Sequence, residues 1–290
     1  MNSIAIGPLI LSNDRFIAVL TIAAFLLVAE VIAWRRRDAA EAIRRWSSAA
    51  VVIWIIAARA GHVLANWEGF APAPWTVLAI WQGGFDIRAG TAGLGATLVA
   101  AFLSRSRTGG PLLIGVAAAA AVFGIATLAL RDDMQGRLPT AGLADLSGLP
   151  VSLADRDGRP LVLNLWATWC PPCRREMPMM VDVARSQDGV DIVFANQGEP
   201  ERIIRDFLGR TGLANDAMIR DPNNTLMQEF GLQGLPSTLF FAADGSLKAV
   251  HTGEISRAAL LAGISDLKAA GDARRFTEPT RQTDHEGDSR

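Results

Sequence analysis

The chain has 290 residues, of which 50% are apolar, with a mean hydropathy of +0.24 and a formal net charge of −1. This length leaves room for two domains, and the positive mean hydropathy indicates that part of the chain lies in lipid. A net charge so close to zero gives no reason to expect a nucleic-acid partner.

Four apolar segments near the N-terminus predict transmembrane helices. The first, residues 16–34, contains Glu30 as its only charge and is long enough to span a bilayer. A cleaved signal peptide is the alternative, but no net positive charge precedes the segment and no small-X-small site comes before Arg35. Further spans are expected at residues 48–65, 87–103 and 111–130, which together make a membrane domain of residues 1–131.

The arginines indicate how these spans are oriented. They cluster between the first two spans and between the last two, whereas the loop of residues 66–85 carries only Glu68. The positive-inside rule then places both arginine-bearing loops in the cytoplasm. Four crossings put the N-terminus and everything after Arg131 outside, in the periplasm or at the cell exterior of a bacterial inner membrane. The arginines are Arg35, Arg36, Arg37, Arg44 and Arg45 in the first loop, and Arg105 and Arg107 in the second.

Glu30, Arg59, Asp86 and Arg88 are costly near lipid and should face the bundle interior or an interface. One interpretation is a pocket for anionic lipid headgroups built on Arg59 and Arg88. The alternative is a set of ion pairs, such as Glu30 with Arg59, that hold the bundle together without a ligand.

After a linker at residues 132–137, a second domain is expected at residues 138–270. Within it, Leu161–Trp166 is an apolar run broken only by Asn164, which is typical of a strand covered on both faces. Residues 271–290 are polar and charged, without apolar periodicity, and are expected to be a disordered tail. The other expected elements are a strand at 151–153, a helix from Cys170 to about 187 kinked at Pro178, strands at 190–195 and 217–220, helices at 200–208, 224–230 and 255–270, and a hairpin of strands 238–241 and 247–250.

Cys170-Pro-Pro-Cys173 follows the apolar strand and opens the next helix. Pro171 and Pro172 have no amide hydrogens, and they are tolerated at a helix start because those amides would have no partner. Cys170 is therefore expected at the helix N-terminus, where unpaired amide hydrogens and the helix dipole favour a thiolate. Cys173 follows about one turn later, near enough for a disulfide. We predict that Cys170 attacks and Cys173 resolves in thiol–disulfide exchange.

Three other uses of the two cysteines compete with redox catalysis. A zinc site normally needs four ligands, and the chain offers two cysteines and three scattered histidines. A structural disulfide would close too small a loop to restrain the unfolded chain much. Two inert buried thiols are the third alternative, for which the start of a helix is a poor place. Because no cysteine precedes Cys170, reducing power must come from a separate membrane electron donor.

Several motifs of this domain occur in a specific order: Asp145-Leu-Ser-Gly148, Asn164-Leu-Trp-Ala-Thr-Trp-Cys-Pro-Pro-Cys173, Glu176, Pro178 and Gly234-Leu-Pro-Ser-Thr238. With them, residues 138–270 resemble the membrane-anchored thioredoxin-like proteins of the TlpA/ResA type. The resemblance implies an α/β thioredoxin-like fold with a central mixed sheet flanked by helices. It also implies a thiol:disulfide oxidoreductase with no cofactor besides the redox-active Cys170–Cys173 disulfide, and no metal.

The resemblance further implies a substrate-binding surface. Leu235-Pro236 is expected to be a cis peptide beside the cysteines, with the backbone of Leu235 pairing with the bound substrate chain. Trp169, Pro171 and Pro172 are expected to contact the same substrate.

Two residues bear on proton transfer. Glu176, one turn after Cys173, is either an ordinary solvated carboxylate or a group that tunes the proton affinity of the thiols. Asn164 stands where soluble thioredoxins carry a buried acid, so that proton relay is expected to be missing.

The membrane half has its own motifs: Ile6-Gly-Pro8, Arg59-Ala-Gly-His-Val-Leu64, Trp81-Gln-Gly-Gly84 and Arg88-Ala-Gly90. In order and spacing they resemble the first part of prolipoprotein diacylglyceryl transferase. That family has more spans, and Arg88 stands where it has its important histidine.

These observations predict a four-pass inner membrane protein whose periplasmic domain reduces disulfides of extracytoplasmic proteins, with cytochrome c maturation as the pathway that the resemblance implies. Membrane lipids are expected partners of its helices. The same dithiol could oxidise instead, since the direction follows the reduction potential. Two alternatives stay open: a lipid-modifying transferase, and a non-catalytic membrane-tethered binding module.

Overall fold

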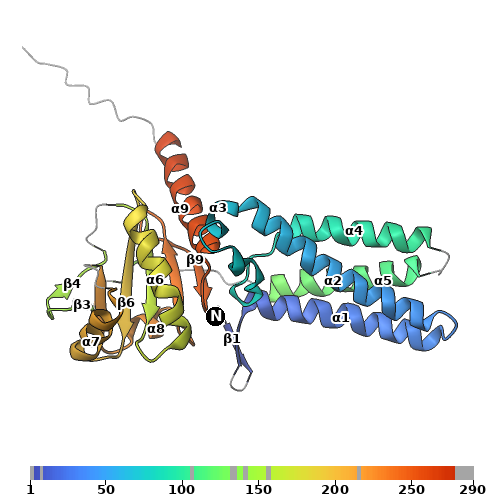
Figure 1. Ribbon diagram of the computed structural model, residues 1–290, viewed down its shortest axis with the longest axis horizontal. Helices are drawn as coiled ribbons and strands as arrows, with labels where there is room; N and C mark the ends of the chain where they lie inside the picture. Colours follow the sequence, from blue (N-terminus) through green and yellow to red (C-terminus); the bar gives the residue numbers. More distant parts are fainter. Residues whose placement is uncertain are drawn as a thin grey trace, which may run out of the picture.

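The computed structural model describes residues 3–6, 9–104, 108–130, 136–139, 143–154, 158–213 and 217–277. A bundle of helices lies on one side of the molecule and a sheet covered by helices on the other, as Figure 1 shows. The bundle is built from the first part of the chain and the sheet domain from the second.

The bundle contains four long helices, α1 (Asn13–Arg35), α2 (Ala40–Ala65), α4 (Ile87–Leu103) and α5 (Gly109–Ala129). Helix α2 packs along α4, and α1 packs along α5. Small residues allow the close approach: a Cβ on Gly61 would lie 2.3 Å from the Cβ of Ala89. Among the described residues, α1, α2 and α5 are long and apolar enough to cross a membrane, and α4 is a shorter apolar helix.

Shorter elements gather at the end of the bundle that faces the sheet domain (Figure 1). A hairpin of β1 (Ser3–Ile6) and β2 (Leu9–Ser12) precedes α1. The segment of residues 66–86, called here the docking loop, joins α2 to α4. It contains α3 (Trp67–Phe70) and the 3₁₀ helices η1 (Pro74–Leu78) and η2 (Ile80–Gln82).

The sheet domain has a seven-stranded mixed sheet in the order β4-β3-β7-β6-β5-β8-β9. Strand β5 pairs in parallel with β6 and antiparallel with β8, as in a thioredoxin-like fold. The strands are β3 (Leu143–Asp145), β4 (Pro150–Val151), β5 (Leu161–Trp166), β6 (Asp191–Gln197), β7 (Met218–Asp221), β8 (Ser237–Phe241) and β9 (Leu247–Thr252).

Strand β5 is buried along its whole length, because both faces of the sheet are covered. Val162 and Trp166 pack with residues of α6 (Pro171–Ser186), α7 (Glu201–Thr211) and α9 (Arg257–Thr277). Leu161, Leu163 and Leu165 belong to a second cluster that includes Leu226 of α8 (Thr225–Glu229). Asn164 shares the α6 face, which brings its amide to the site.

Some expected boundaries were wrong. Helix α2 begins at Ala40 rather than residue 48, because a membrane helix continues past the apolar stretch while its arginines reach water. Helix α9 continues to Thr277, into the segment expected to be disordered, because no proline interrupts the sequence before Pro279. Residues 155–157, part of the linker and residues 278–290 lie outside the described residues.

Candidate active site

The two cysteines lie where β5 leads into α6, joined by a disulfide with an S–S length of 2.03 Å. Cys170 is the N-cap of α6, and its Sγ accepts a hydrogen bond from the backbone amide of Cys173 at 3.3 Å. Pro171 and Pro172 occupy the first helical positions, where no amide donor is missed. A sulfur held at this helix end is stabilised as a thiolate once the disulfide is reduced.

The disulfide is nearly enclosed by protein. Cys170 keeps 2% of its surface exposed and Cys173 none, whereas the preceding Trp169 is 67% exposed. Both cysteines are thus buried, and Cys170 directly follows the exposed Trp169. Trp169 offers a large apolar contact surface directly beside Cys170.

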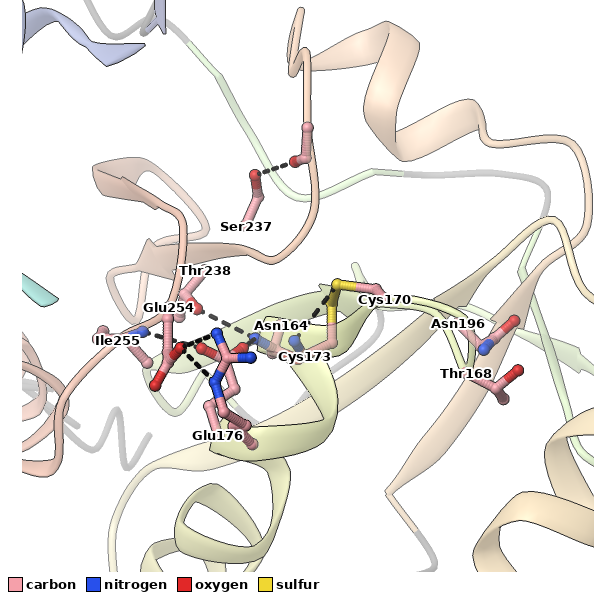
Figure 2. The surroundings of a disulfide bond; sticks show 12 residues. Asn164, Thr168, Cys170, Cys173, Glu176, Asn196, Ser237, Thr238, Glu254 and Ile255 are labelled. Atoms are coloured by element: carbon pink, nitrogen blue, oxygen red, sulfur yellow. Dashed lines mark hydrogen bonds and ion pairs between the residues drawn. A yellow bond between two sulfur atoms is a disulfide. The ribbon is translucent and has the colours of Figure 1, made fainter. Parts of the chain in front are cut away.

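A buried acid lies one helical turn below Cys173, as Figure 2 shows. Glu176 is 2% exposed, and its carboxylate accepts hydrogen bonds from Asn164 Nδ2 at 2.9 Å and from the backbone amide of Ile255 at 2.8 Å. Asn164 Nδ2 also donates to Thr238 Oγ1 at 3.1 Å. The interpretation of Glu176 as a solvated carboxylate is therefore wrong.

The pKa of Glu176 is raised to about 8, mainly by burial and to a smaller degree by the negative charge of Glu254. The hydrogen bonds from Ile255 and Asn164, together with the charge of Arg175, act in the opposite direction but are outweighed. A carboxyl group with this pKa exchanges its proton near neutral pH. Asn164 replaces the strand acid of soluble thioredoxins, but a buried acid is still present because α6 supplies it.

The sequence analysis missed Glu199, which follows β6. Its carboxylate accepts hydrogen bonds from Thr168 N at 2.7 Å, Thr168 Oγ1 at 2.5 Å and Asn196 Nδ2 at 2.7 Å. Two of these bonds come from Thr168 and hold the loop that carries Trp169 and Cys170, and the third ties Glu199 to β6. Its position after β6 could have pointed to Glu199, since the carboxyl ends of the parallel strands β5 and β6 meet at one edge of the sheet.

The Leu235–Pro236 peptide is cis, which confirms the expectation. It lies in the loop before β8, and Leu235 and Trp169 line the same pocket of about 490 Å³. Amide side chains give this pocket a polar wall; the remaining lining residues are Gln197, Gly198, Asn224, Met227, Gln233 and Gly234. The sequence-predicted contact residues Trp169 and Leu235 thus come together, with Pro171 exposed and Pro172 half-buried beside them. Among the described residues, no group of three or more His, Cys, Asp or Glu side chains is placed to hold a metal ion.

Arg59 and Arg88 belong to the bundle, apart from the disulfide. Arg59 is 7% exposed, and its guanidinium donates to the backbone carbonyls of Thr76, Val77, Gly83 and Gly84 at 2.6–3.0 Å. These bonds tie the docking loop to α2, which is a structural use of the charge.

The proposed pairing of Glu30 with Arg59 is wrong. Glu30 instead accepts two hydrogen bonds from Arg44, at 2.9 and 2.6 Å. The reason is geometric: Glu30 and Arg44 face each other near the turn that joins α1 to α2, whereas Arg59 lies almost at the other end of α2. Arg88 lies exposed in the first turn of α4.

Residues 134–268 match the Redoxin family. A thiol-disulfide oxidoreductase ResA of Geobacillus thermodenitrificans is 33% identical over 132 residues, which cover 45% of this chain and 75% of the relative. ResA of Halalkalibacterium halodurans is 36% identical over 113 residues, 38% of this chain and 64% of the relative. A thioredoxin-family thiol:disulfide interchange protein of Chlorobium tepidum, of known structure, is 24% identical with a TM-score of 0.41, over 47% of this chain and 98% of that one.

Proposed function

The chain belongs to the ResA family of thiol-disulfide oxidoreductases, and from this membership we propose that it is a membrane-anchored enzyme that reduces disulfides of extracytoplasmic proteins. The observation that carries the proposal is the Cys170–Cys173 disulfide across the first turn of α6. The exposed Trp169 and the cis Leu235–Pro236 peptide give a protein substrate a place to bind beside it.

The reduced enzyme starts with two thiols. Cys170, as a thiolate, attacks one sulfur of the substrate disulfide, and the other substrate sulfur leaves as a thiolate that takes up a proton. Cys173 then loses its proton and attacks Cys170 Sγ, which breaks the mixed disulfide and releases the second substrate thiol. The enzyme is left with the Cys170–Cys173 disulfide, and two electrons have passed to the substrate.

In this scheme the ionised form of Glu176, which is in equilibrium with the protonated form near neutral pH, receives the proton of Cys173. The two residues are one helical turn apart, and a carboxyl group with a pKa of about 8 can take up a proton at neutral pH and lose it again. The disulfide is itself the redox centre. A separate membrane dithiol donor then restores the thiols by the reverse exchange, and the two cysteines are the only ones in the chain.

The anchoring and the orientation are part of the proposal. The arginines of the α1–α2 turn lie at the end of the bundle away from the sheet domain, which supports a periplasmic site by the positive-inside rule (Figure 1). Trp67, Trp75 and Trp81 are each more than 50% exposed on the docking loop, which suits a membrane–water interface. Apocytochrome disulfides, which must be reduced to thiols before haem attachment, are the substrates we propose.

The test is a trap. We expect Cys173→Ala to accumulate mixed disulfides with exported proteins through Cys170, because the resolving step is lost. The matched Cys170→Ser variant should accumulate none, and adducts that require Cys173 would contradict the assignment of the nucleophile.

The reduction potential of the intact protein tests the direction. A value near or below that of thioredoxin, about −270 mV, is expected, and a value well above about −180 mV would contradict a reductase.

A further inference from the structure

The membrane half packs closely against the sheet domain, called here the redox domain. Phe70 of the docking loop is 1% exposed and packs with Val63 of α2 and Ala258 of α9. Gly69 lies so near α9 that a Cβ there would be 2.7 Å from the Cα of Ala258. Such an approach leaves no room for any side chain other than hydrogen at position 69. The contact is thus shaped for this arrangement of the two halves.

A polar contact lies beside this apolar one. Gln82 Nε2, at the end of η2, donates to Glu254 Oε1 at 2.9 Å. The other oxygen of Glu254 accepts two bonds from Arg175 of α6, at 2.9 and 2.6 Å. The Glu254 side chain is 11% exposed, so its charge depends on these donors for stabilisation. One of the two donors comes from the membrane half.

Glu254 is the immediate neighbour of Ile255, whose backbone amide donates to the Glu176 carboxylate at 2.8 Å (Figure 2). The position of that amide follows the position of Glu254, because one peptide unit separates them. A pocket of about 300 Å³ lies between the two halves, and Glu176, Glu254, Phe70 and Gln82 all line it. The docking loop therefore forms one wall of the pocket that Glu176 lines, so separation of the two halves would open this pocket to bulk water.

We propose that the docking loop is an interaction surface of the membrane half for the redox domain, and that Gln82 and Glu254 are positioning residues that hold the Ile255 amide on Glu176. The inference rests on the proposed function and adds a regulator to that site. When the halves are docked, Glu176 is shielded and holds its proton. When they separate, water reaches the carboxyl group and it ionises at lower pH. The membrane half thus controls the acid that serves the dithiol.

Other charged groups lie around this site. Arg175 and Glu254 face Glu176 from α6 and from the segment before α9. Arg257 of α9 is paired with Asp182 of α6. His251 of β9 lies with Nε2 3.3 Å from the Glu254 carbonyl, and burial lowers its pKa, so it is neutral where Glu176 titrates. Desolvation is the largest influence on Glu176, so loss of the shield should lower its pKa.

The experiment uses the full chain in lipid nanodiscs and two matched pairs of variants. Gly69→Ala should separate the halves, whereas Gly95→Ala in α4, where a Cβ meets nothing within 4 Å, should not. Gln82→Glu keeps the shape but places an acceptor and a negative charge against Glu254, whereas Gln82→Lys keeps a donor. Hydrogen exchange of a peptide covering residues 254–258 reports separation. The rate of Cys170 alkylation in the reduced protein, measured against pH, should change slope where Glu176 titrates; this change of slope is called here the break. Its absence in Glu176→Gln would show that the break is due to Glu176.

We expect faster exchange at residues 254–258 in Gly69→Ala and Gln82→Glu, together with a break in the alkylation profile that moves down by about one pH unit or more. Gly95→Ala and Gln82→Lys should keep the wild-type break. Faster exchange with an unmoved break would overturn the proposal, and so would unchanged exchange in both disrupting variants. Disulfide reduction assayed on the same samples distinguishes failure of the proposed function from failure of this inference. A protein that reduces no substrate contradicts the proposed function, but the break can still be measured and still tests the role of the docking loop.

Discussion

Glu176 holds a proton at neutral pH that an exposed glutamate would have lost, because burial raises its pKa to about 8. The side chain of Asn164 can form a hydrogen bond with Glu176 whether its carboxyl group is ionised or neutral. Its NH₂ group donates to the ionised carboxylate, and after rotation of the amide its carbonyl oxygen can accept from the neutral acid. An aspartate at position 164 would instead place two carboxyl groups together and oppose ionisation of the pair. The asparagine thus leaves Glu176 as the one acid that titrates beneath the dithiol.

The raised pKa predicts a pH-dependent stability. Between about pH 4.5 and 8 the folded state keeps the Glu176 proton while the unfolded state has lost it, so the free energy of unfolding falls as pH rises through this window. The slope contributed by this group approaches ~1.4 kcal/mol per pH unit. Glu176→Gln, which cannot titrate, should remove that slope. Hydrogen exchange of the β5 amides across this pH range measures it, and an unchanged slope in the variant would show that Glu176 is ionised when folded.

The loop between β5 and α6 depends on an element that follows it in the chain. Glu199 lies after β6 and receives three hydrogen bonds, two of them from Thr168, only two residues before Cys170. The parallel pairing of β5 and β6 places the ends of both strands at the same edge of the sheet. The geometry of Trp169 and Cys170 is therefore set by β6 as well as by the helix that they precede.

Removing this carboxylate should loosen the loop. We expect Glu199→Ala to reduce the stability of the domain by about 2 kcal/mol, since hydrogen bonds to a charged group are lost. It should also slow attack by Cys170 on a model disulfide by about tenfold, which corresponds to roughly 1.4 kcal/mol of activation free energy. Glu201→Ala is the control, because Glu201 forms only a partly exposed i,i+4 pair with Arg205. Equal rates in the two variants would rule out a positioning role for Glu199.

In the whole molecule, the end of the bundle that carries the docking loop also contacts the redox domain (Figure 1). The Gln82–Glu254 hydrogen bond and the packing of Phe70 on Ala258 join residues far apart in the sequence. The loop and the domain must therefore lie on the same side of the membrane. The arginines of the α1–α2 turn, at the opposite end, favour the cytoplasmic side for that turn.

This arrangement can be tested by labelling in intact cells. In a Cys170→Ser/Cys173→Ser background, Leu78→Cys on the docking loop should react with an impermeant maleimide from outside, because Leu78 is 77% exposed. Asp38→Cys, exposed in the α1–α2 turn, should react only after the membrane is permeabilised. The reverse pattern would place the redox domain in the cytoplasm.

The sequence by itself determined most of the helices and strands and the place of the two cysteines at the start of α6. Apolar runs and their lengths indicated the four bundle helices and the buried strand β5, and two prolines after Cys170 located the start of α6. These features depend on neighbouring residues, whose hydrophobicity and backbone restrictions act locally. The family motif around Pro236 likewise led to the cis peptide.

Only the tertiary structure decided the environment of each charged group. Glu176 is buried where Asn164 and Ile255, from distant parts of the chain, bond to its carboxylate, and its raised pKa follows from that burial. Glu30 pairs with Arg44, and Arg59 bonds to the backbone of the docking loop, because those groups are the ones that lie near them in space. Desolvation and hydrogen bonding depend on what lies within a few ångströms in space, and spacing along the sequence does not determine that.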